Sequence, residues 1–160
     1  MALESFSRSI EVDADRAHTW EVLTDVETLA EWVGIVQEVQ TIRHLERYRA
    51  VLQDKVGPFK LRADLSVVVT VEEPGVRVVV SASGKDRAVD SKIKVDAVLN
   101  LADRGSGTSI AAEGSYQVTG KVAGMGSGVI HKKADRILDD FFGNASRVLG
   151  AERVGNGSAN

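Results

Sequence analysis

The sequence predicts an α+β fold: a curved antiparallel sheet of about six or seven strands, two short helices after the first strand, and one long C-terminal helix. Two observations predict it. Between Gln37 and Thr119, apolar residues alternate with polar ones, as in strands that have one face in water. Between Lys121 and Leu149, apolar residues recur every three or four positions instead, as on one face of a helix.

The N-terminal segment predicts a strand followed by a helix. A strand over Leu3–Val12 carries its apolar side chains on one parity, and Arg8 falls on that parity too. Either Arg8 points inward, or a bulge in this strand turns it toward water. Asp13 is suited to cap the following helix, whose apolar stripe includes Trp20 and Leu23.

A second short helix is expected over Val26–Val33, with Asp25 as its cap and Gly34 at its end. The strands that follow are joined by short turns such as Glu73–Gly75, which predicts an antiparallel meander. Their apolar parity includes small residues that leave space on the inner face: Ala63, Ala82, Ala97, Ala112 and Gly114.

The long helix is expected to cross the concave face of the sheet. Roughly 28 residues at ~1.5 Å each span about 42 Å, whereas the strands are about 30 Å long. One helix cannot fill the face of so large a sheet, so we expect a cavity between them. Gly120, Gly124, Gly126 and Gly128 open this helix. They indicate either close packing on the sheet or a pliable segment beside a ligand entrance.

Length and composition narrow the class of protein. The 160 residues fit one domain, which we assign to residues 1–150, with 151–160 as a disordered tail. A net charge of −3 and scattered basic residues argue against nucleic acid as a partner. The chain has no cysteine, and we identify no secretory signal and no apolar run near the ~20 residues of a spanning helix. A cytoplasmic location is expected, with peripheral contact at the inner face of the membrane left open.

We predict no catalytic and no metal-binding residues. His18, His44 and His131 lie on different elements and form no metal-ligand pair, and no Gly-x-Ser-x-Gly motif is present. The strand carboxylate worth considering as an acid or base is Asp54, which shares the inward parity of Tyr48; the alternative is a position at the end of a strand.

A ligand-binding cavity is typically apolar with a few polar groups, and the inward parities predict its lining. We expect hydrogen bonds to a ligand oxygen from Arg8, Ser91, Thr108 and Tyr116. The other predicted ligand-binding residues are apolar or small: Trp20, Trp32, Tyr48, Leu65, Val67, Val78, Val80, Ile93, Val95, Ala97, Ile110, Ala112, Gly114, Met125, Gly126, Val129, Ile130, Ala134, Ile137 and Phe141.

The apolar segment after the second helix has two interpretations. Val33, Ile35 and Val36 either form an edge of the core or an exposed lip that contacts a membrane or a protein partner.

The order of elements, together with the segment from Val12 to Val33, resembles the helix-grip superfamily of START domains and polyketide cyclases. More specifically, the second half of the chain resembles the carbon monoxide dehydrogenase G-subunit family. The likeness rests on a Gly-Thr turn, a strand ending in Val-x-Gly, an Ala-x-x-Gly segment and a Phe pair: Gly107-Thr108, Val118–Gly120, Ala123–Gly126 and Phe141-Phe142.

This resemblance implies an accessory protein of a molybdenum-containing CO dehydrogenase or a related redox enzyme. It implies non-catalytic binding and carriage of a hydrophobic small molecule, such as an isoprenoid quinone or another lipid, with no covalent cofactor. Two alternatives remain at this point: a cyclase- or hydratase-like enzyme of the same fold, and a protein–protein adaptor for membrane recruitment.

Overall fold

A computed structural model describes residues 3–86, 88 and 90–150 of the chain. Its strands form a seven-stranded antiparallel sheet in the order β1-β7-β6-β5-β4-β3-β2. The strands are β1 (Glu4–Val12), β2 (Val36–Arg43), β3 (Arg47–Val56), β4 (Phe59–Glu73), β5 (Arg77–Asp86), β6 (Ser91–Arg104) and β7 (Gly107–Gly120). The predicted α+β class and the antiparallel meander are confirmed, and the first strand is added beside the last.

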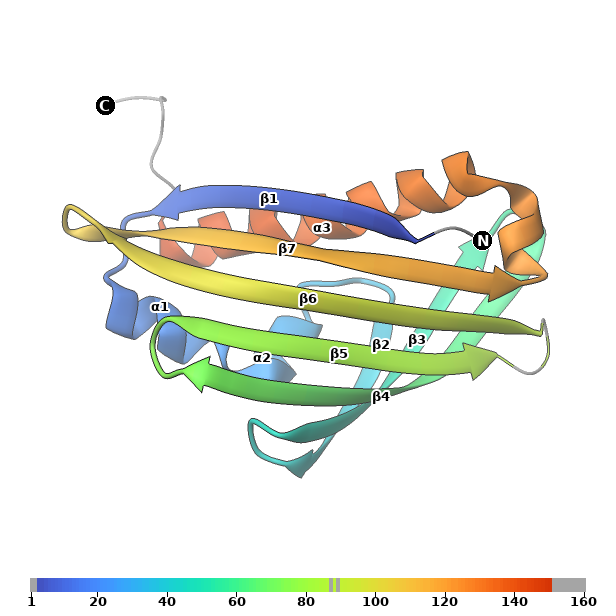
Figure 1. Cartoon of the computed structure of the whole chain (residues 1–160), viewed down its shortest axis with the longest axis horizontal. Helices are drawn as coiled ribbons and strands as arrows, with labels where there is room; N and C mark the ends of the chain where they lie inside the picture. Colours follow the sequence, from blue (N-terminus) through green and yellow to red (C-terminus); the bar gives the residue numbers. More distant parts are fainter. Residues whose placement is uncertain (1–2, 87, 89, 151–160) are drawn as a thin grey trace.

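The helices lie behind the sheet in the view of Figure 1, so they share one of its faces. They are α1 (Arg16–Leu23), α2 (Val26–Ala30), the short 3₁₀ helix η1 (Val122–Met125) and α3 (Ser127–Leu149). One continuous helix from Lys121 was expected, but Gly126 has φ +97°, outside the helical region. The chain therefore turns once as η1 before α3 begins.

The cap of α1 differs from the prediction. The Asp15 carboxylate, not that of Asp13, accepts a hydrogen bond of 2.8 Å from the main-chain N–H of His18. Asp13 instead donates its main-chain N–H to the carbonyl oxygen of Gly150 at 2.6 Å. The end of β1 is thereby joined to the end of α3, while Asp25 caps α2 as predicted.

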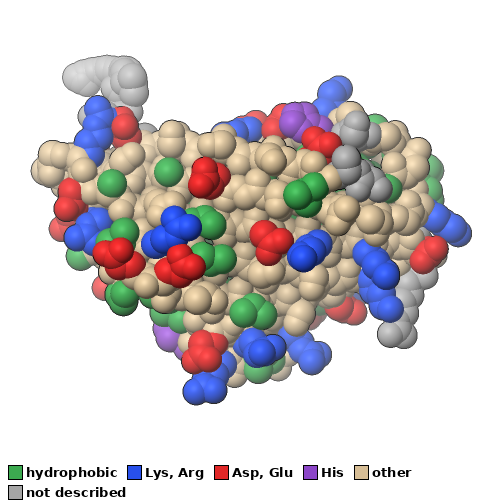
Figure 2. Space-filling view, viewed as in Figure 1, with side chains coloured by type: hydrophobic (Ala, Val, Ile, Leu, Met, Phe, Trp, Pro, Cys, Tyr) green, Lys and Arg blue, Asp and Glu red, His purple; other side chains and the backbone are tan. Residues whose placement is uncertain are grey.

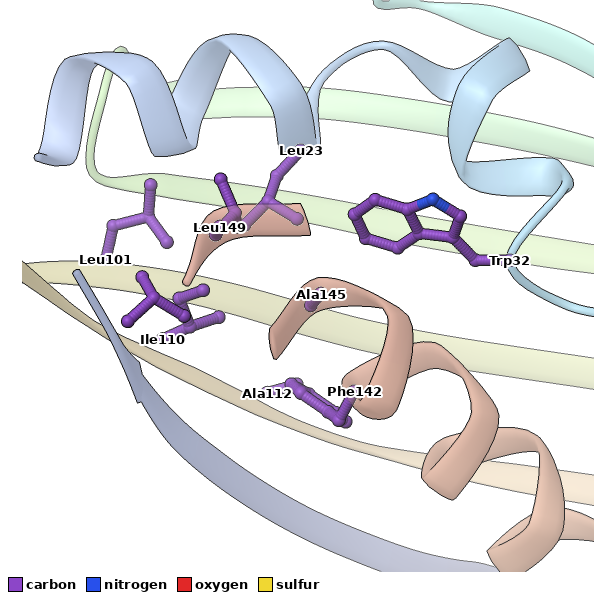
Figure 3. Close-up of a cluster of buried hydrophobic side chains, with 9 residues drawn as sticks. Leu23, Trp32, Leu101, Ile110, Ala112, Phe142, Ala145 and Leu149 are labelled. Carbon is purple, nitrogen blue, oxygen red and sulfur yellow. The ribbon is translucent and has the colours of Figure 1, made fainter. Parts of the chain in front are cut away.

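Buried apolar side chains gather mainly at two ends of the space between α3 and the sheet. Figure 3 shows the closed-end core, where the last turns of α3 face α1 and the strands. This core consists of Val12, Leu23, Trp32, Leu101, Ile110, Ala112, Phe142, Ala145 and Leu149. The open-end core lies under the first turns of α3 and consists of Val56, Leu61, Tyr116, Val118, Val122 and Ile130.

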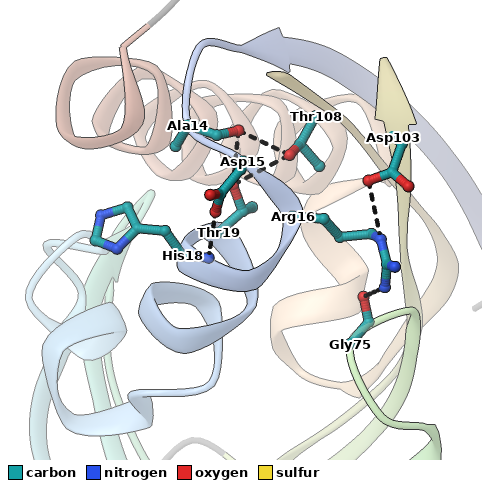
Figure 4. Close-up of polar contacts among 8 residues, drawn as sticks. All are labelled: Ala14, Asp15, Arg16, His18, Thr19, Gly75, Asp103 and Thr108. Carbon is teal, nitrogen blue, oxygen red and sulfur yellow. Dashed lines mark hydrogen bonds and ion pairs between the residues drawn. The ribbon is translucent and has the colours of Figure 1, made fainter. Parts of the chain in front are cut away.

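Polar contacts hold α1 against the strand ends (Figure 4). The buried hydroxyl of Thr108 donates to the carbonyl oxygen of Ala14 at 2.8 Å. The guanidinium of Arg16 on α1 contacts two strand ends: the Asp103 carboxylate on β6 at 3.1 Å, and the carbonyl oxygen of Gly75 in the turn before β5 at 2.9 Å. Two of these bonds satisfy main-chain carbonyl oxygens, those of Ala14 and Gly75, and together the contacts fix α1 to the strands at the closed end.

The opposite face of the sheet is turned to the viewer in Figure 2. Lys, Arg, Asp and Glu side chains are scattered over it with both signs mixed, and the surface between them is largely uncharged. On β1, the side chains that alternate with the inward ones include Ser5, Ser7 and Ser9, which are exposed. The side facing α3 is therefore where the sheet buries its apolar parity.

Candidate functional site

A cavity of about 200 Å³ lies at the open end, between the sheet and the first half of α3. Residues from β1, β3, β4, β6, β7, η1 and α3 line it, together with one residue from the segment before β2. They are Phe6, Ile35, Leu52, Asp54, Val56, Leu61, Ile93, Val95, Tyr116, Val118, Val122, Ile130, Lys133, Ala134, Ile137 and Leu138.

The strand register explains the floor of this cavity. Ile93 lies opposite Val118, and Val95 lies opposite Tyr116, in the unbroken pairing of β6 with β7. Because directly paired residues project from the same face, these four side chains form one apolar surface. Ala134 on α3 faces the same space, and its small side chain leaves the cavity open on the helix side.

Asp54 and Lys133 form an ion pair in the wall of the cavity. The Lys133 Nζ atom lies 3.2 Å from each carboxylate oxygen of Asp54. The Asp54 side chain is 18% exposed and that of Lys133 is 32% exposed, so the pair lies at the boundary between cavity and solvent. It bridges β3 and α3 directly across the gap between them.

Tyr116 contributes its side chain to the lining of the cavity. The residue is 8% exposed, and its hydroxyl lies 3.5 Å from Nδ1 of His131 on α3. Burial raises the pKa of Tyr116 above its usual value, and the negative charges of Glu4 and Asp135 raise it further. The hydroxyl is protonated at neutral pH, as in any tyrosine, and can donate a hydrogen bond to His131 or to a ligand oxygen within reach.

Arg8 stays on the inward parity of β1. The pairing of β1 with β7 has no register shift, and Arg8 lies opposite Ala112, so no bulge turns it away from α3. Its guanidinium contacts Asp139 at 2.6 Å and Asp135 at 3.4 Å. The Arg8 side chain therefore lies against α3 and joins this helix to β1, and Arg8 does not belong to the cavity lining.

Part of the predicted ligand-binding set comes together in the cavity. The predicted residues that line it are Ile93, Val95, Tyr116, Ile130, Ala134 and Ile137. Ile35, expected in the lip, lines the cavity as well. Val33 and Val36 flank it and are half-buried.

A second group of predicted residues packs in the cores instead. Trp20, Trp32, Ile110, Ala112 and Phe141 belong to the closed-end core or pack against it. The rings of Trp32 and Phe141 lie 5.5 Å apart. Tyr48, Val67, Val78 and Val80 belong to a third cluster or pack against it. These aromatic and branched side chains stabilise the scaffold around the cavity.

The remaining predicted residues have other neighbours. The Ser91 hydroxyl accepts the main-chain N–H of Val122 at 3.0 Å. A Cβ at Gly57 would collide with the side chain of Met125, so Met125 covers that turn. Ala97 and Gly114 pair beside Phe6.

Three further predicted residues also lie outside the cavity lining. Leu65 lines a separate groove of about 580 Å³ on β2, β3 and β4. Gly126 ends η1, and Val129 packs on the open-end core.

The lining residues that the sequence prediction left out fall into two kinds. The apolar ones continue an inward parity or extend a helical stripe: Phe6, Leu52, Val56, Leu61, Val118, Val122 and Leu138. The charged ones are Asp54, which parity had marked as inward, and Lys133. For Lys133 alone, nothing in the sequence indicated a place in the lining, because the side chain of a lysine on a helix is usually exposed to water.

Among the described residues, no group of three or more His, Cys, Asp or Glu side chains is placed to hold a metal ion. Within the same part of the chain, every helix is too short or too polar to cross a membrane.

The fold is shared with several solved structures. A conserved protein from Geobacillus kaustophilus matches with a TM-score of 0.77 and 20% identity over 92% of this chain and 95% of that one. A START superfamily protein from Mycobacterium smegmatis matches with a TM-score of 0.72 and 12% identity over 91% and 97%. A protein from Thermus thermophilus matches with a TM-score of 0.65 and 14% identity over 92% and 97%. At these identities the likeness shows the fold alone.

Comparison with functionally curated proteins gave no match. A family model, however, matches residues 9–150 of the chain, which include every described helix, the end of β1 and all the other strands. That model describes CoxG, the G subunit of carbon monoxide dehydrogenase. The chain therefore belongs to the carbon monoxide dehydrogenase G-subunit (CoxG) family.

Proposed function

We propose that this protein binds and carries a hydrophobic small molecule, an isoprenoid quinone or another lipid, without catalysing a reaction on it. It would serve as accessory protein to a molybdenum-containing CO dehydrogenase or a related redox enzyme. The observation that carries this proposal is the apolar cavity under α3, whose lining includes the side chain of Tyr116.

The size of the cavity limits what it holds. Its volume is about 200 Å³, whereas an apolar cavity of about 150 Å³ is known to admit benzene. A substituted ring, or the end of a branched chain, is therefore the part of the ligand that fits. The rest of a prenylated molecule extends beyond the cavity.

The polar group favours a ligand with an oxygen acceptor. The side chain of Tyr116 belongs to the cavity lining, and its hydroxyl is protonated at neutral pH, as that of an ordinary tyrosine is. A protonated hydroxyl donates to a carbonyl or ether oxygen, and a quinone ring presents such a carbonyl.

The charged groups in the lining favour carriage over catalysis. Asp54 is the carboxylate of this lining, and Lys133 contacts both of its oxygens at 3.2 Å. A general base needs a free lone pair directed at the substrate. Asp54 would first have to leave Lys133, and this requirement argues against the cyclase or hydratase alternative.

The expected affinity suits a carrier. Removing roughly 300 Å² of apolar surface from water contributes about 7 kcal/mol, and the loss of ligand freedom reduces the net gain. We expect binding no tighter than the micromolar range. Such a complex releases its ligand readily, as transfer between a membrane and an enzyme requires.

The family name supports the proposed partner, since it describes a subunit of carbon monoxide dehydrogenase. We place the protein on the cytoplasmic side, in peripheral contact with the membrane that stores lipid-soluble quinones.

Native mass spectrometry of protein purified without detergent tests the proposal. We expect an extra mass that solvent extraction removes and that lipid analysis identifies as an isoprenoid quinone or another lipid. The apo protein should then take up added menaquinone or ubiquinone. An apo mass at purification, together with no uptake of either quinone, would contradict the quinone proposal.

A further inference from the structure

The first half of α3 is fastened unequally on its two flanks. His131 and Lys133 are two residues apart, which places them about 200° apart around the helix axis. On the His131 flank, the contacts with β1 and β7 include Arg8 with Asp135 and Asp139, in addition to Tyr116 with His131. On the opposite flank, the described contact with β3 is the ion pair of Lys133 with Asp54.

The second half of α3 is fixed more firmly. Phe142, Ala145 and Leu149 are buried in the closed-end core. The carbonyl oxygen of Gly150 accepts the main-chain N–H of Asp13 at 2.6 Å. Opening the closed-end core would expose large apolar side chains, so we expect a movement that admits a ligand in the half of α3 that covers the cavity.

A glycine-rich segment precedes this half. Gly126 has φ +97° and offers no side-chain cap to α3. A Cβ added at Gly124, Gly126 or Gly128 would meet no heavy atom within 4 Å. Close packing, which the sequence offered as one explanation, therefore fits only Gly120, where a Cβ would collide with the carbonyl oxygen of Asp90. The other three favour the pliable segment, because glycine leaves the backbone its widest freedom.

We propose that the ligand enters and leaves between β3 and the first half of α3, and that the Asp54–Lys133 ion pair is the latch that closes this entrance. This inference rests on the proposed function. On entry the ion pair separates, and the first half of α3 moves outward about the glycine segment. The apolar residues that the ligand then passes, Leu52, Ile35 and Ile137, already line the cavity.

The position of the pair suits such a latch. At 18% and 32% exposure, the two side chains remain in reach of water, so their charges are rehydrated when the pair separates. A fully buried pair would carry a large penalty on opening, whereas an exposed pair contributes little. The His131 flank is a poorer entrance, because opening it separates Arg8 from two carboxylates and also Tyr116 from His131.

Exchange kinetics give the first test. Menadione, a two-ring quinone without a tail, is mixed with the apo protein, and quenching of tryptophan fluorescence is followed by stopped flow. In Lys133→Met, which keeps an apolar stem of similar length, we expect association and dissociation rates both to rise roughly tenfold, with a smaller change in their ratio. Lys132→Met, at the exposed neighbouring position, should exchange at the wild-type rate. Wild-type rates in Lys133→Met would overturn the latch.

A reversible cross-link gives the second test. The chain has no cysteine, so Asp54→Cys/Lys133→Cys can be bridged by a short bis-thiosulfonate reagent and released by reduction. The bridged protein should exchange menadione at least about tenfold more slowly than the same protein after reduction. A matched bridge in Arg8→Cys/Asp139→Cys, on the other flank, should leave exchange unchanged.

The outcomes separate the two proposals. Equal exchange before and after reduction of the Asp54/Lys133 bridge, or a block by the Arg8/Asp139 bridge alone, overturns the entrance while binding itself stands. No menadione binding by the wild-type or reduced protein overturns binding of this quinone ring and the latch together.

Discussion

The side-chain amide of Asn144 donates a hydrogen bond of 3.1 Å to the main-chain carbonyl oxygen of Trp32. This bond joins α3 to the turn after α2, two elements that lie far apart in the sequence. The Trp32 side chain is buried in the closed-end core, and the same Asn144 amide contacts the carbonyl oxygen of Asp140. Asn144 thus joins α3 to the segment before β2 at the closed end.

Replacing Asn144 with Ala should lower the free energy of unfolding by about 1–3 kcal/mol, because the partly buried Trp32 carbonyl loses its donor. Urea unfolding followed by tryptophan fluorescence measures the change. The control is Arg147→Ala, which removes an exposed contact with Asn144 and should cost less than about 0.5 kcal/mol. Equal losses in both variants would contradict the role given to the Trp32 bond.

Two glycines near the start of α3 should respond in opposite ways to alanine. Gly120 has φ +89°, and a Cβ there would strike the Asp90 carbonyl oxygen, so Gly120→Ala should destabilise the protein by about 1–3 kcal/mol. Gly128 lies in the first turn of α3 with open space around it. Gly128→Ala should stabilise it by up to about 1 kcal/mol. Thermal and urea unfolding distinguish the two, and a loss of stability in Gly128→Ala would show that the segment is packed after all.

The inward face of the sheet could be predicted from the sequence, because antiparallel pairing preserves the alternation of side chains. Val95 and Tyr116 share a face in the sequence pattern and lie opposite each other in the structure. The alternation does not predict which part of this face α3 covers by close packing and which part lines the cavity. Trp32 packs against Phe141 of α3 at the closed end, while Ile130 of the same helix lines the cavity. That division depends on which helix residues fill space, a property of packing and not of periodicity.

The charged pair at the cavity shows a second limit. Parity placed Asp54 on the inner face, but nothing in a single sequence indicates which cation would meet it. Lys133 lies on another element, and its position depends on the turn of η1 and the start of α3 at Gly126. A one-residue shift of that start would rotate Lys133 by about 100° away from β3. An ion pair that depends on the rotation of a helix about its axis, as Asp54–Lys133 does, can be identified only from the folded structure.

Filling the cavity should weaken ligand binding without unfolding the protein. Ala134 lines the cavity from α3, so Ala134→Phe should occupy much of its volume and reduce menadione binding at least about tenfold. The melting temperature should stay within a few degrees of the wild-type value or rise, because the new ring occupies existing space. Isothermal titration measures the binding. Wild-type affinity in a folded Ala134→Phe protein would place the ligand elsewhere.

Tyr116 should make the protein less stable at alkaline pH. Burial, followed by the charges of Glu4 and Asp135, raises the pKa of Tyr116 above 10.0, the ordinary value for tyrosine and the value expected in the unfolded chain. Between these two pKa values the folded protein keeps the proton that the unfolded chain loses, so the free energy of unfolding falls as pH rises. The stabilising contribution is complete below pH 10 and is lost as pH rises through the folded pKa.

Tyr116→Phe removes this titration, and the comparison isolates it from the lysines that titrate in the same range. We expect the difference in the free energy of unfolding, wild type minus Tyr116→Phe, to be constant from about pH 7 to 9 and to decrease above pH 10. Urea unfolding at each pH gives the difference, and tyrosinate absorbance locates the ionisation. A difference that stays constant above pH 10 would mean that the folded protein does not raise the pKa of Tyr116 and that its side chain is as well hydrated as in the unfolded chain.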